Sequence, residues 1–371
     1  MNNRHAVIAL NMISGIGYAK YRSLVDKFEE PKKIFEASQD ELLEVKGIGE
    51  NLAVRILEFS SSGELENELE IAERSGVQII TLLDEEYPEQ LRTIYDPPLC
   101  LYVRGVLPDF NRNAVAIVGS RKLSKYGERM AKSITEGAVF HNFVVVSGLA
   151  FGADYIAHKT VVDNDGITVG VLGGGLAQIT PKEHIPLARE IIQKGGAVIT
   201  EFPINFPVSR QSFPRRNRIV AALSEATIVI EAGLESGALI TADLANEYGK
   251  NVFAVPGNVD NPQSRGCHKL IRNGEANLIE SFNDVLEIMD CGLFDVGSLG
   301  ESESELCSNN NEDILSPNER LIYDLLNAGE KSFDELVLAT QFDSGVLIST
   351  LMMMELKMII LKNPDKTYRI R

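Results

Sequence analysis

Six short apolar runs recur between residues 114 and 290, and they constrain the fold more than any other feature of the chain. The runs are AVAIVG, FVVVSG, ITVGVLG, GAVIT, ATIVIEA and NVFAVPG, and each is continuous rather than alternating. Strands that are buried on both faces have this composition. Helical patterns are predicted between them over 124–141, 153–163, 184–193, 214–223, 237–248 and 264–273. This alternation predicts an α/β fold with a Rossmann-like, doubly wound parallel sheet.

Loops rich in small residues follow most of these runs. VGSRKLSKYG follows the first run, SGLAFGADYIAH the second, GGGLAQI the third and EAGLESGALITA the fifth. In an open parallel sheet such loops gather at the carboxyl edge, where ligands bind. Ser120, Ser147 and Ser236 offer hydroxyls there, and helix N-termini offer backbone amides. The loops therefore predict a phosphate-binding edge, although tight strand-to-helix turns alone also favour Gly and Ser.

The stretch FPRRNRIVAAL gathers three arginines in a chain whose formal net charge is -17. We expect Arg216 and Arg218 to meet phosphate oxygens and Asn217 to fix the loop, and Phe213 adds a flat aromatic face beside them. Arg215 points elsewhere on a helix and is expected to be solvated. The alternative is that these arginines form ion pairs within the protein, with Glu201, Glu225 or Glu231 as partners.

Several site types are absent from the sequence. No G-x-x-x-x-G-K-[ST] occurs, so the chain is not a P-loop ATPase. No G-x-G-x-x-G follows the first strand with an acid about 20 residues further on, which argues against a nicotinamide cofactor. No acidic cluster that could hold Mg²⁺ stands in the loops. Asp154 and His158 lie four residues apart on one predicted helix, and we expect them to brace its N-terminal end. The alternative is a catalytic pair or a metal site. We therefore expect no cofactor, no metal and no catalytic residues.

Residues 1–62 are predicted to form a helical helix-hairpin-helix (SAM-like) domain. MISGIGYAKYRSLVDKF and EVKGIGENLAVRIL each place Gly-Ile-Gly before a helix. Gly15, Gly17, Gly47 and Gly49 allow tight turns whose amides face outward at a helix N-terminus. Whether this repeat binds DNA or only closes a small bundle stays open. The following region, 63–290, is taken as one extended Rossmann-like domain, in which the apolar runs around 77–104 extend the sheet.

The C-terminal fifth of the chain is expected to divide into an acidic linker, 291–313, and a winged-helix domain, 314–371. Twelve of the 53 acidic residues lie between Arg272 and Arg320, where no Lys or Arg occurs. The linker composition is typical of a solvated tether, and the alternative is that it screens basic sites until nucleic acid displaces it. The last segment suggests three helices followed by two short strands. A protein-contact role is favoured there over duplex reading, since the third helix carries only Lys357 at its end.

The chain is expected to be cytoplasmic. No run of about 18 apolar residues occurs, and the N-terminal stretch lacks the pattern of a signal peptide. Its four cysteines are scattered without a C-x-x-C pair, which fits a reducing compartment and offers no zinc site.

The motifs AIVGSR, VVSGLA, FPRRNRIVAALS, VIEAGLESGALITA and VFAVPGN, in this order and spacing, resemble the DNA-processing protein A family (DprA/Smf) over about residues 77–290. The resemblance implies a Rossmann-like core that binds single-stranded DNA and forms a homodimer. It also implies delivery of a RecA-type recombinase onto the strand during recombination and DNA uptake in natural transformation. No chemical reaction is attributed to the family, so the chain is not expected to be an enzyme.

The family's motifs fall on defined positions of this chain. The DNA-binding positions they imply are Gly119, Ser120, Arg121, Ser147, Gly148, Phe213, Arg216, Asn217, Arg218, Ser236, Gly237 and Lys250. One departure is Phe151, which stands where the family usually has Arg, and Lys122 or Lys125 could replace the lost cation. The rival hypothesis is a nucleotide-processing enzyme similar to phosphoribohydrolases on the same scaffold. Those enzymes carry P-G-G-x-G-T, which this chain lacks.

Overall fold

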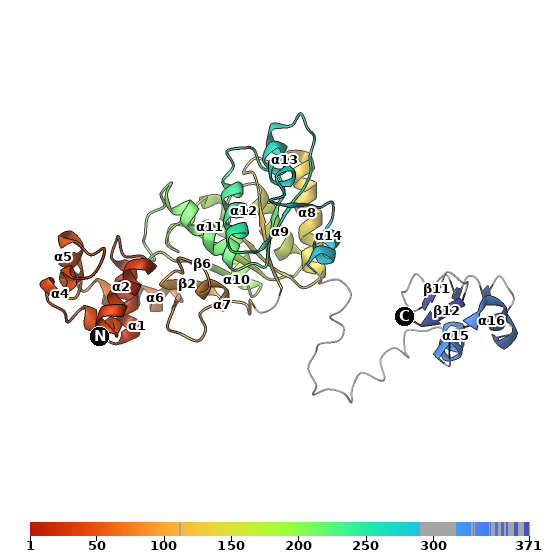
Figure 1. Cartoon of the computed structure of the whole chain (residues 1–371), viewed down its shortest axis with the longest axis horizontal. Helices are drawn as coiled ribbons and strands as arrows, with labels where there is room; N and C mark the ends of the chain where they lie inside the picture. Colours follow the sequence, from red (N-terminus) through yellow and green to blue (C-terminus); the bar gives the residue numbers. More distant parts are fainter. Residues whose placement is uncertain are drawn as a thin grey trace. The chain divides into compact units, whose positions relative to one another are not determined.

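The computed structural model describes residues 1–110, 113–289, 317–327, 329, 331–340, 342, 346–347, 350–351, 354, 360–362 and 367–370. The chain forms two compact units, Met1–Gly292 and Leu293–Arg371. In Figure 1 the described residues of the first unit run from red to cyan, and those of the second are blue. The predicted linker 291–313 lies outside the described residues.

The N-terminal helices repeat one turn geometry. Gly15 and Gly47, the first glycine of each Gly-Ile-Gly triplet, have φ of 96° and 89°, which favour glycine. Ile16 and Ile48 are buried between them and the following helix, and the second glycine of each triplet is the N-cap residue of that helix. The predicted hairpin repeat is therefore confirmed. The helices are α1 (Asn3–Met12), α2 (Tyr18–Phe28), α3 (Pro31–Ile34), α4 (Gln39–Leu43), α5 (Glu50–Phe59) and α6 (Glu64–Ser75).

A nine-stranded sheet forms the centre of the first unit, in the order β1-β2-β6-β5-β4-β3-β7-β8-β9. β1 and β2 pair antiparallel with each other and β2 with β6, whereas the remaining pairs are parallel. All six predicted strands are present, and the two earlier apolar runs extend the sheet as expected. The strands are β1 (Gln78–Thr81), β2 (Cys100–Gly105), β3 (Ala114–Val118), β4 (Val144–Ser147), β5 (Thr168–Val171), β6 (Ala197–Thr200), β7 (Ala226–Val229), β8 (Asn251–Ala254) and β9 (Asn277–Leu278).

Helices cover both faces of this sheet, as a doubly wound fold requires (Figure 1). One face carries α8 (Lys125–Phe140), α9 (Ala153–Asp163), α10 (Ile185–Gln193) and α14 (Phe282–Ile288). The other carries α7 (Glu89–Arg92), α11 (Ser212–Ala222), α12 (Gly237–Glu247) and α13 (Arg265–Arg272). Two short 3₁₀ turns, η1 (Lys182–His184) and η2 (Pro262–Ser264), precede α10 and α13. The chain builds outward from β3 in one direction as far as β6 and then returns to β7 on the other side of β3.

The N-terminal helices share a hydrophobic core with the sheet. Leu10 and Ile56 belong to the same buried cluster as Tyr102 on β2 and Ile191 on α10. A polar contact adds to this packing, since the buried carboxylate of Glu68 on α6 accepts a hydrogen bond of 2.7 Å from the amide of Ile204. The helical region and the sheet are therefore held as one compact unit.

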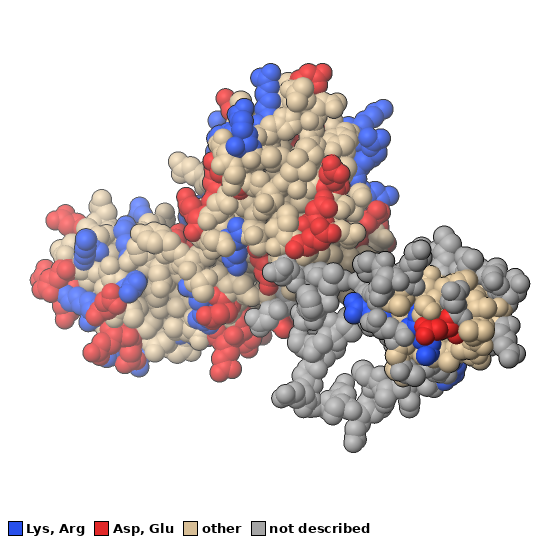
Figure 2. Space-filling view, turned by 45° about the vertical axis from the view of Figure 1, so that its right-hand side comes forward, with Lys and Arg blue, Asp and Glu red and all other residues tan. Residues whose placement is uncertain are grey.

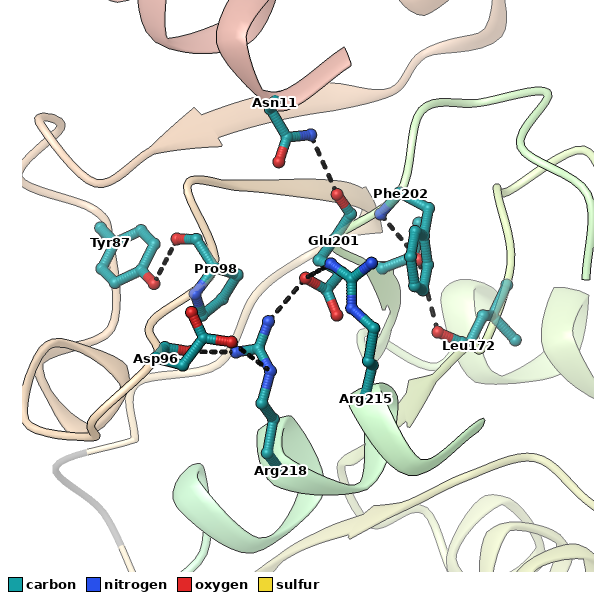
Figure 3. Close-up of polar contacts among 10 residues, drawn as sticks. Asn11, Tyr87, Asp96, Pro98, Leu172, Glu201, Phe202, Arg215 and Arg218 are labelled. Atoms are coloured by element: carbon teal, nitrogen blue, oxygen red, sulfur yellow. Dashed lines mark hydrogen bonds and ion pairs between the residues drawn. The ribbon is translucent and has the colours of Figure 1, made fainter. Parts of the chain in front are cut away.

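A buried carboxylate ties α11 to the other elements around it (Figure 3). Glu201, directly after β6, is 4% exposed, and its Oε2 accepts from Arg218 Nη2 at 2.6 Å and Arg215 Nη2 at 3.0 Å. Its carbonyl accepts from the side-chain amide of Asn11 on α1 at 3.0 Å. Arg218 Nη1 also donates to the carbonyl of Asp96, in the connection between β1 and β2. We call these five residues the Glu201 cluster.

The second unit contains α15 (Pro317–Asn327), β10 (Lys331–Ser332), α16 (Phe333–Thr340), β11 (Ile360–Lys362) and β12 (Thr367–Ile370). Its strands form an antiparallel sheet in the order β10-β12-β11. Leu347 and Leu351 are buried in its core. The winged helix stays a prediction, because much of the segment expected to form its third helix lies outside the described residues.

The Glu201 cluster predicts unequal roles for its two arginines. Arg218→Ala should lower the free energy of unfolding by about 3 kcal/mol, because it removes the buried partner of a buried carboxylate. Arg215→Ala should cost about 1 kcal/mol or less, since the Arg215 side chain is 54% exposed. Urea denaturation followed by circular dichroism measures both. Equal, small losses would show that Arg218 does not anchor α11.

Candidate nucleic-acid interface

A pocket of about 680 Å³ opens at the carboxyl edge of the sheet, outside the ends of β3 and β7. This is where the strand order reverses, the position at which doubly wound sheets bind ligands. The loops after β3, β4 and β7 line it, together with the N-terminal residues of α11, α12 and α13. Three helix N-termini therefore contribute to one pocket, and each favours an anion.

Two glycines allow the close approach of the elements around the pocket. A Cβ on Gly119, after β3, would lie 2.8 Å from the Cβ of Ala153 at the start of α9. A Cβ on Gly148, after β4, would lie 1.3 Å from Nη1 of Arg216. Two of the three predicted site glycines thus have a steric role, and Gly148 leaves the space that the Arg216 guanidinium occupies. A Cβ on the third, Gly237, would meet none of the described residues within 4 Å.

Arg216 lies at the wall of the pocket and is only 5% exposed. The carboxylate of Asp154 is 4.0 Å from its Nη1, which is beyond hydrogen-bond distance. Its Nε is buried without a hydrogen-bond partner among the described residues. Burial lowers the pKa of Arg216 and raises that of Asp154, because each charged form loses solvation. A guanidinium left incompletely paired in this way offers donors to an anion.

Asp154 and His158 brace the loop after β4, whereas they were expected to brace the start of α9 itself. Asp154 Oδ2 accepts from two backbone amides of the loop 148–150, at 3.1 and 3.3 Å. Burial lowers the pKa of His158 to about 3, so its ring is neutral at pH 7. Nε2 accepts from the amide of Leu149 at 3.3 Å, which places the proton on Nδ1, 2.8 Å from the hydroxyl of Thr168.

Arg121 and Phe213 form a stacked pair at the pocket. The Arg121 guanidinium lies over the half-buried ring of Phe213, 5.2 Å from its centroid. A Cβ on Gly173 would lie 3.0 Å from the same ring, so the loop after β5 supports Phe213 from below. The GGGLAQI loop was expected to face a ligand with the other loops, and it packs under Phe213 instead.

The polar side chains predicted at this edge mostly hold its loops together. Asn217 donates from Nδ2 to the carbonyl of Gly237 at 3.2 Å, which joins α11 to α12. The hydroxyl of Ser236 is the N-cap of α12, and that of Ser120 closes a turn with the backbone of Lys122. All of these residues except Lys122 line the pocket.

Three predicted site residues lie away from the pocket. Ser147 is fully buried and donates to the carbonyl of Ile117 at 2.6 Å. Lys250 precedes β8 and therefore lies at the amino edge of the sheet, opposite the pocket. Arg218 belongs to the Glu201 cluster.

Helix geometry explains the position of Arg218. Residues two apart on a helix point about 200° away from each other, so Arg216 and Arg218 cannot share a face. Arg215 and Arg218 are three apart and do share one, where both meet Glu201. For these two residues, the ion-pair alternative describes the structure, and Arg215 is paired rather than simply solvated.

The pocket also includes residues that the sequence analysis missed. Arg265, the first residue of α13, is an exposed cation, and Leu234 and Ile240 are exposed apolar residues at 57% and 41%. Arg265 could have been identified from the sequence, because it lies at the start of the helix predicted after the sixth strand of the parallel core.

Figure 2 shows basic and acidic side chains mixed over one face of the protein, with several basic ones near the top of the view.

Two further features concern the described residues as a set. No group of three or more His, Cys, Asp or Glu residues among them could hold a metal ion. None of the described helices has the length and apolar character needed to cross a membrane.

Comparison with known families gives two matches. Residues 78–290 match the family described as DNA recombination-mediator protein A. Residues 7–60 match the SAM-like helix-hairpin-helix tandem family. The first match contains every element that lines the pocket, and the second coincides with the hairpin repeat.

Curated relatives and solved structures give the same result. Protein Smf of Escherichia coli is 35% identical over 332 residues, covering 89% of this chain and 87% of its own. The X-ray structure of DprA from Streptococcus pneumoniae superposes with a TM-score of 0.67 at 32% identity, over 77% of this chain and 98% of that one. A DprA structure from Helicobacter pylori, described for its single-stranded DNA binding mode, gives 0.53 at 29% identity, over 59% and 99%. The chain therefore belongs to the DNA recombination-mediator protein A family, the DprA/Smf proteins.

Proposed function

We propose that this protein binds single-stranded DNA in the pocket at the carboxyl edge of its sheet and presents the strand to a RecA-type recombinase. In this proposal Arg121, Arg216 and Arg265 meet phosphates, and the helix N-termini add backbone amides. The Phe213 and Arg121 pair offers a flat surface to a base. The protein acts by binding rather than by catalysis, in the cytosol.

The observation that carries the proposal is the incompletely paired guanidinium of Arg216. Buried polar groups in proteins normally have hydrogen-bond partners, and an unpartnered one at a pocket wall calls for an explanation. A phosphate oxygen in the pocket would accept from this guanidinium and offset the cost of its burial. Asp154, at 4.0 Å, holds the group in place without using its donors.

A single strand suits the pocket better than a duplex does. The pocket lies among loops and is bordered by the apolar side chains of Leu234 and Ile240, which suit unstacked bases. Base stacking and phosphate contacts both tolerate any sequence, which a mediator of general recombination requires. The single-stranded DNA binding mode described for the Helicobacter pylori relative supports the same choice.

The recombinase and a homodimer complete the proposal. Both are carried over from the family, and DNA uptake in natural transformation is the process they would serve. Light scattering tests the dimer, and recombinase loading onto strands coated with single-strand-binding protein tests delivery. The rival function, a phosphoribohydrolase-like enzyme, predicts release of free base from nucleoside monophosphates. We expect none.

Arg121→Ala tests the pocket directly. We expect affinity for single strands of any sequence to fall roughly tenfold, since a charge-assisted contact is lost. The slope of log affinity against log salt should become shallower by about 0.7 for the lost phosphate contact. Fluorescence anisotropy over a salt series measures both, with duplex DNA for comparison. Arg74→Ala is the matched control, because Arg74 is exposed on α6 and pairs with Glu70 rather than with a pocket residue. Loss of affinity in both variants alike would remove the pocket as the binding site.

Phe213→Leu should separate stacking from charge. It keeps an apolar side chain and loses the flat face, so affinity should fall by about 1–3 kcal/mol while the salt slope stays unchanged. Because Arg121 stacks on Phe213, the double variant should show a coupling above about 0.5 kcal/mol. Circular dichroism must first show native folding of each variant. Strict additivity would mean that the two residues contact the strand independently.

A further inference from the structure

Two aromatic side chains are exposed beside the pocket, and neither has a role in the site described above. Phe151, in the loop after β4, is 46% exposed, and Tyr155, in the first turns of α9, is 38% exposed. Both rings contact the same imidazole. His184 lies edge-to-face with Phe151 at a centroid distance of 4.9 Å, and at 33° to Tyr155 at 4.8 Å. We call Phe151, Tyr155 and His184 the aromatic platform.

The platform is fixed by a buried support. His184 is 3% exposed, and its Nδ1 lies 2.9 Å from the carbonyl of Leu149, within hydrogen-bond distance. The imidazole therefore positions the two outer rings from below. Large aromatic side chains that are held rigid while open to solvent lose little conformational entropy when a flat ligand stacks on them.

The platform is continuous with the pocket. Ala150, next to Phe151 in the chain, lines the pocket. Gly152, on its other side, packs against the Ser120–Arg121 backbone so closely that a Cβ there would lie 2.1 Å from the carbonyl oxygen of Ser120. The amide of Ala153 donates to that same carbonyl at 3.2 Å. A strand bound at Arg121 would therefore reach the platform directly as it leaves the pocket.

We propose that the aromatic platform is a second nucleic-acid subsite, on which a base of the bound strand stacks beside the Arg121 pocket. This rests on the proposed single-strand binding. Phe151 and Tyr155 bring no cation, so the subsite adds stacking and not phosphate pairing. The occupant is the same strand rather than a protein, because the residues directly after Phe151 contact the backbone of the phosphate-binding loop that follows β3.

Strand length separates the two subsites. Phe151→Ala should leave the affinity for the shortest bound oligothymidylates unchanged, because these fill only the pocket. Above a threshold length it should lower affinity about tenfold, with an unaltered salt slope. Phe140→Ala is the matched control: Phe140 is 81% exposed at the end of α8 and also lies edge-to-face with a histidine, His141, at 5.1 Å. It is at the opposite edge of the sheet and should behave as the parent protein does at every length.

A fluorescent reporter gives a second measurement. The chain has no tryptophan, so Phe151→Trp places a single indole on the platform and keeps a stacking face. Strands above the threshold length should quench its fluorescence and bind with parental affinity. The same strands should leave Phe140→Trp unquenched.

The outcomes distinguish the two proposals. If the parent protein binds no single strand, the proposed function fails. If the parent binds and Arg121→Ala weakens it, while Phe151→Ala has no effect at any length and Phe151→Trp is not quenched, only the platform proposal is overturned. Length-dependent loss in Phe151→Ala together with quenching of Phe151→Trp supports the platform.

Discussion

The reversal of strand order between β3 and β7 is the constraint on which the rest of the site depends. Parallel strands send their loops to one edge, and the reversal makes the loops on the two sides diverge, which opens a crevice. Gly119 and Gly148 keep this crevice narrow by removing side chains where backbones and a guanidinium must approach. The helices that follow the strands then direct their N-termini into it.

Helix α11 uses its two faces for different tasks. Arg215 and Arg218 pair with Glu201 at the end of β6, whose carbonyl accepts from Asn11 on α1, so this face links the helix to the N-terminal region. Arg216 turns toward the pocket, beside Asp154. One short basic motif thus contributes to stability and to the candidate binding site, and the helical period decides which arginine does which.

Net charge is a poor guide to what this chain binds. The value of -17 arises largely in the segment between Arg272 and Arg320, which begins after the last pocket-lining residue, Arg265. At the pocket the incompletely paired guanidinium, the helix N-termini and two exposed arginines create a local preference for anions. Local arrangement, and not the total charge, sets the chemistry of this edge.

The sequence alone determined the strands, the parallel core and the general location of the site. Continuous β-branched runs with glycine-rich ends have few alternatives to buried parallel strands, and Gly-Ile-Gly before a helix specifies its turn through φ. Only the tertiary structure decided the roles of single residues. Arg218 and Lys250 both match the site motifs in sequence. The orientation of α11 turns Arg218 toward Glu201, and the direction of β8 places Lys250 at the edge of the sheet opposite the pocket. The pairing of Phe151 and Tyr155 on His184 joins residues from separate segments, so it depends on contacts that no local pattern encodes.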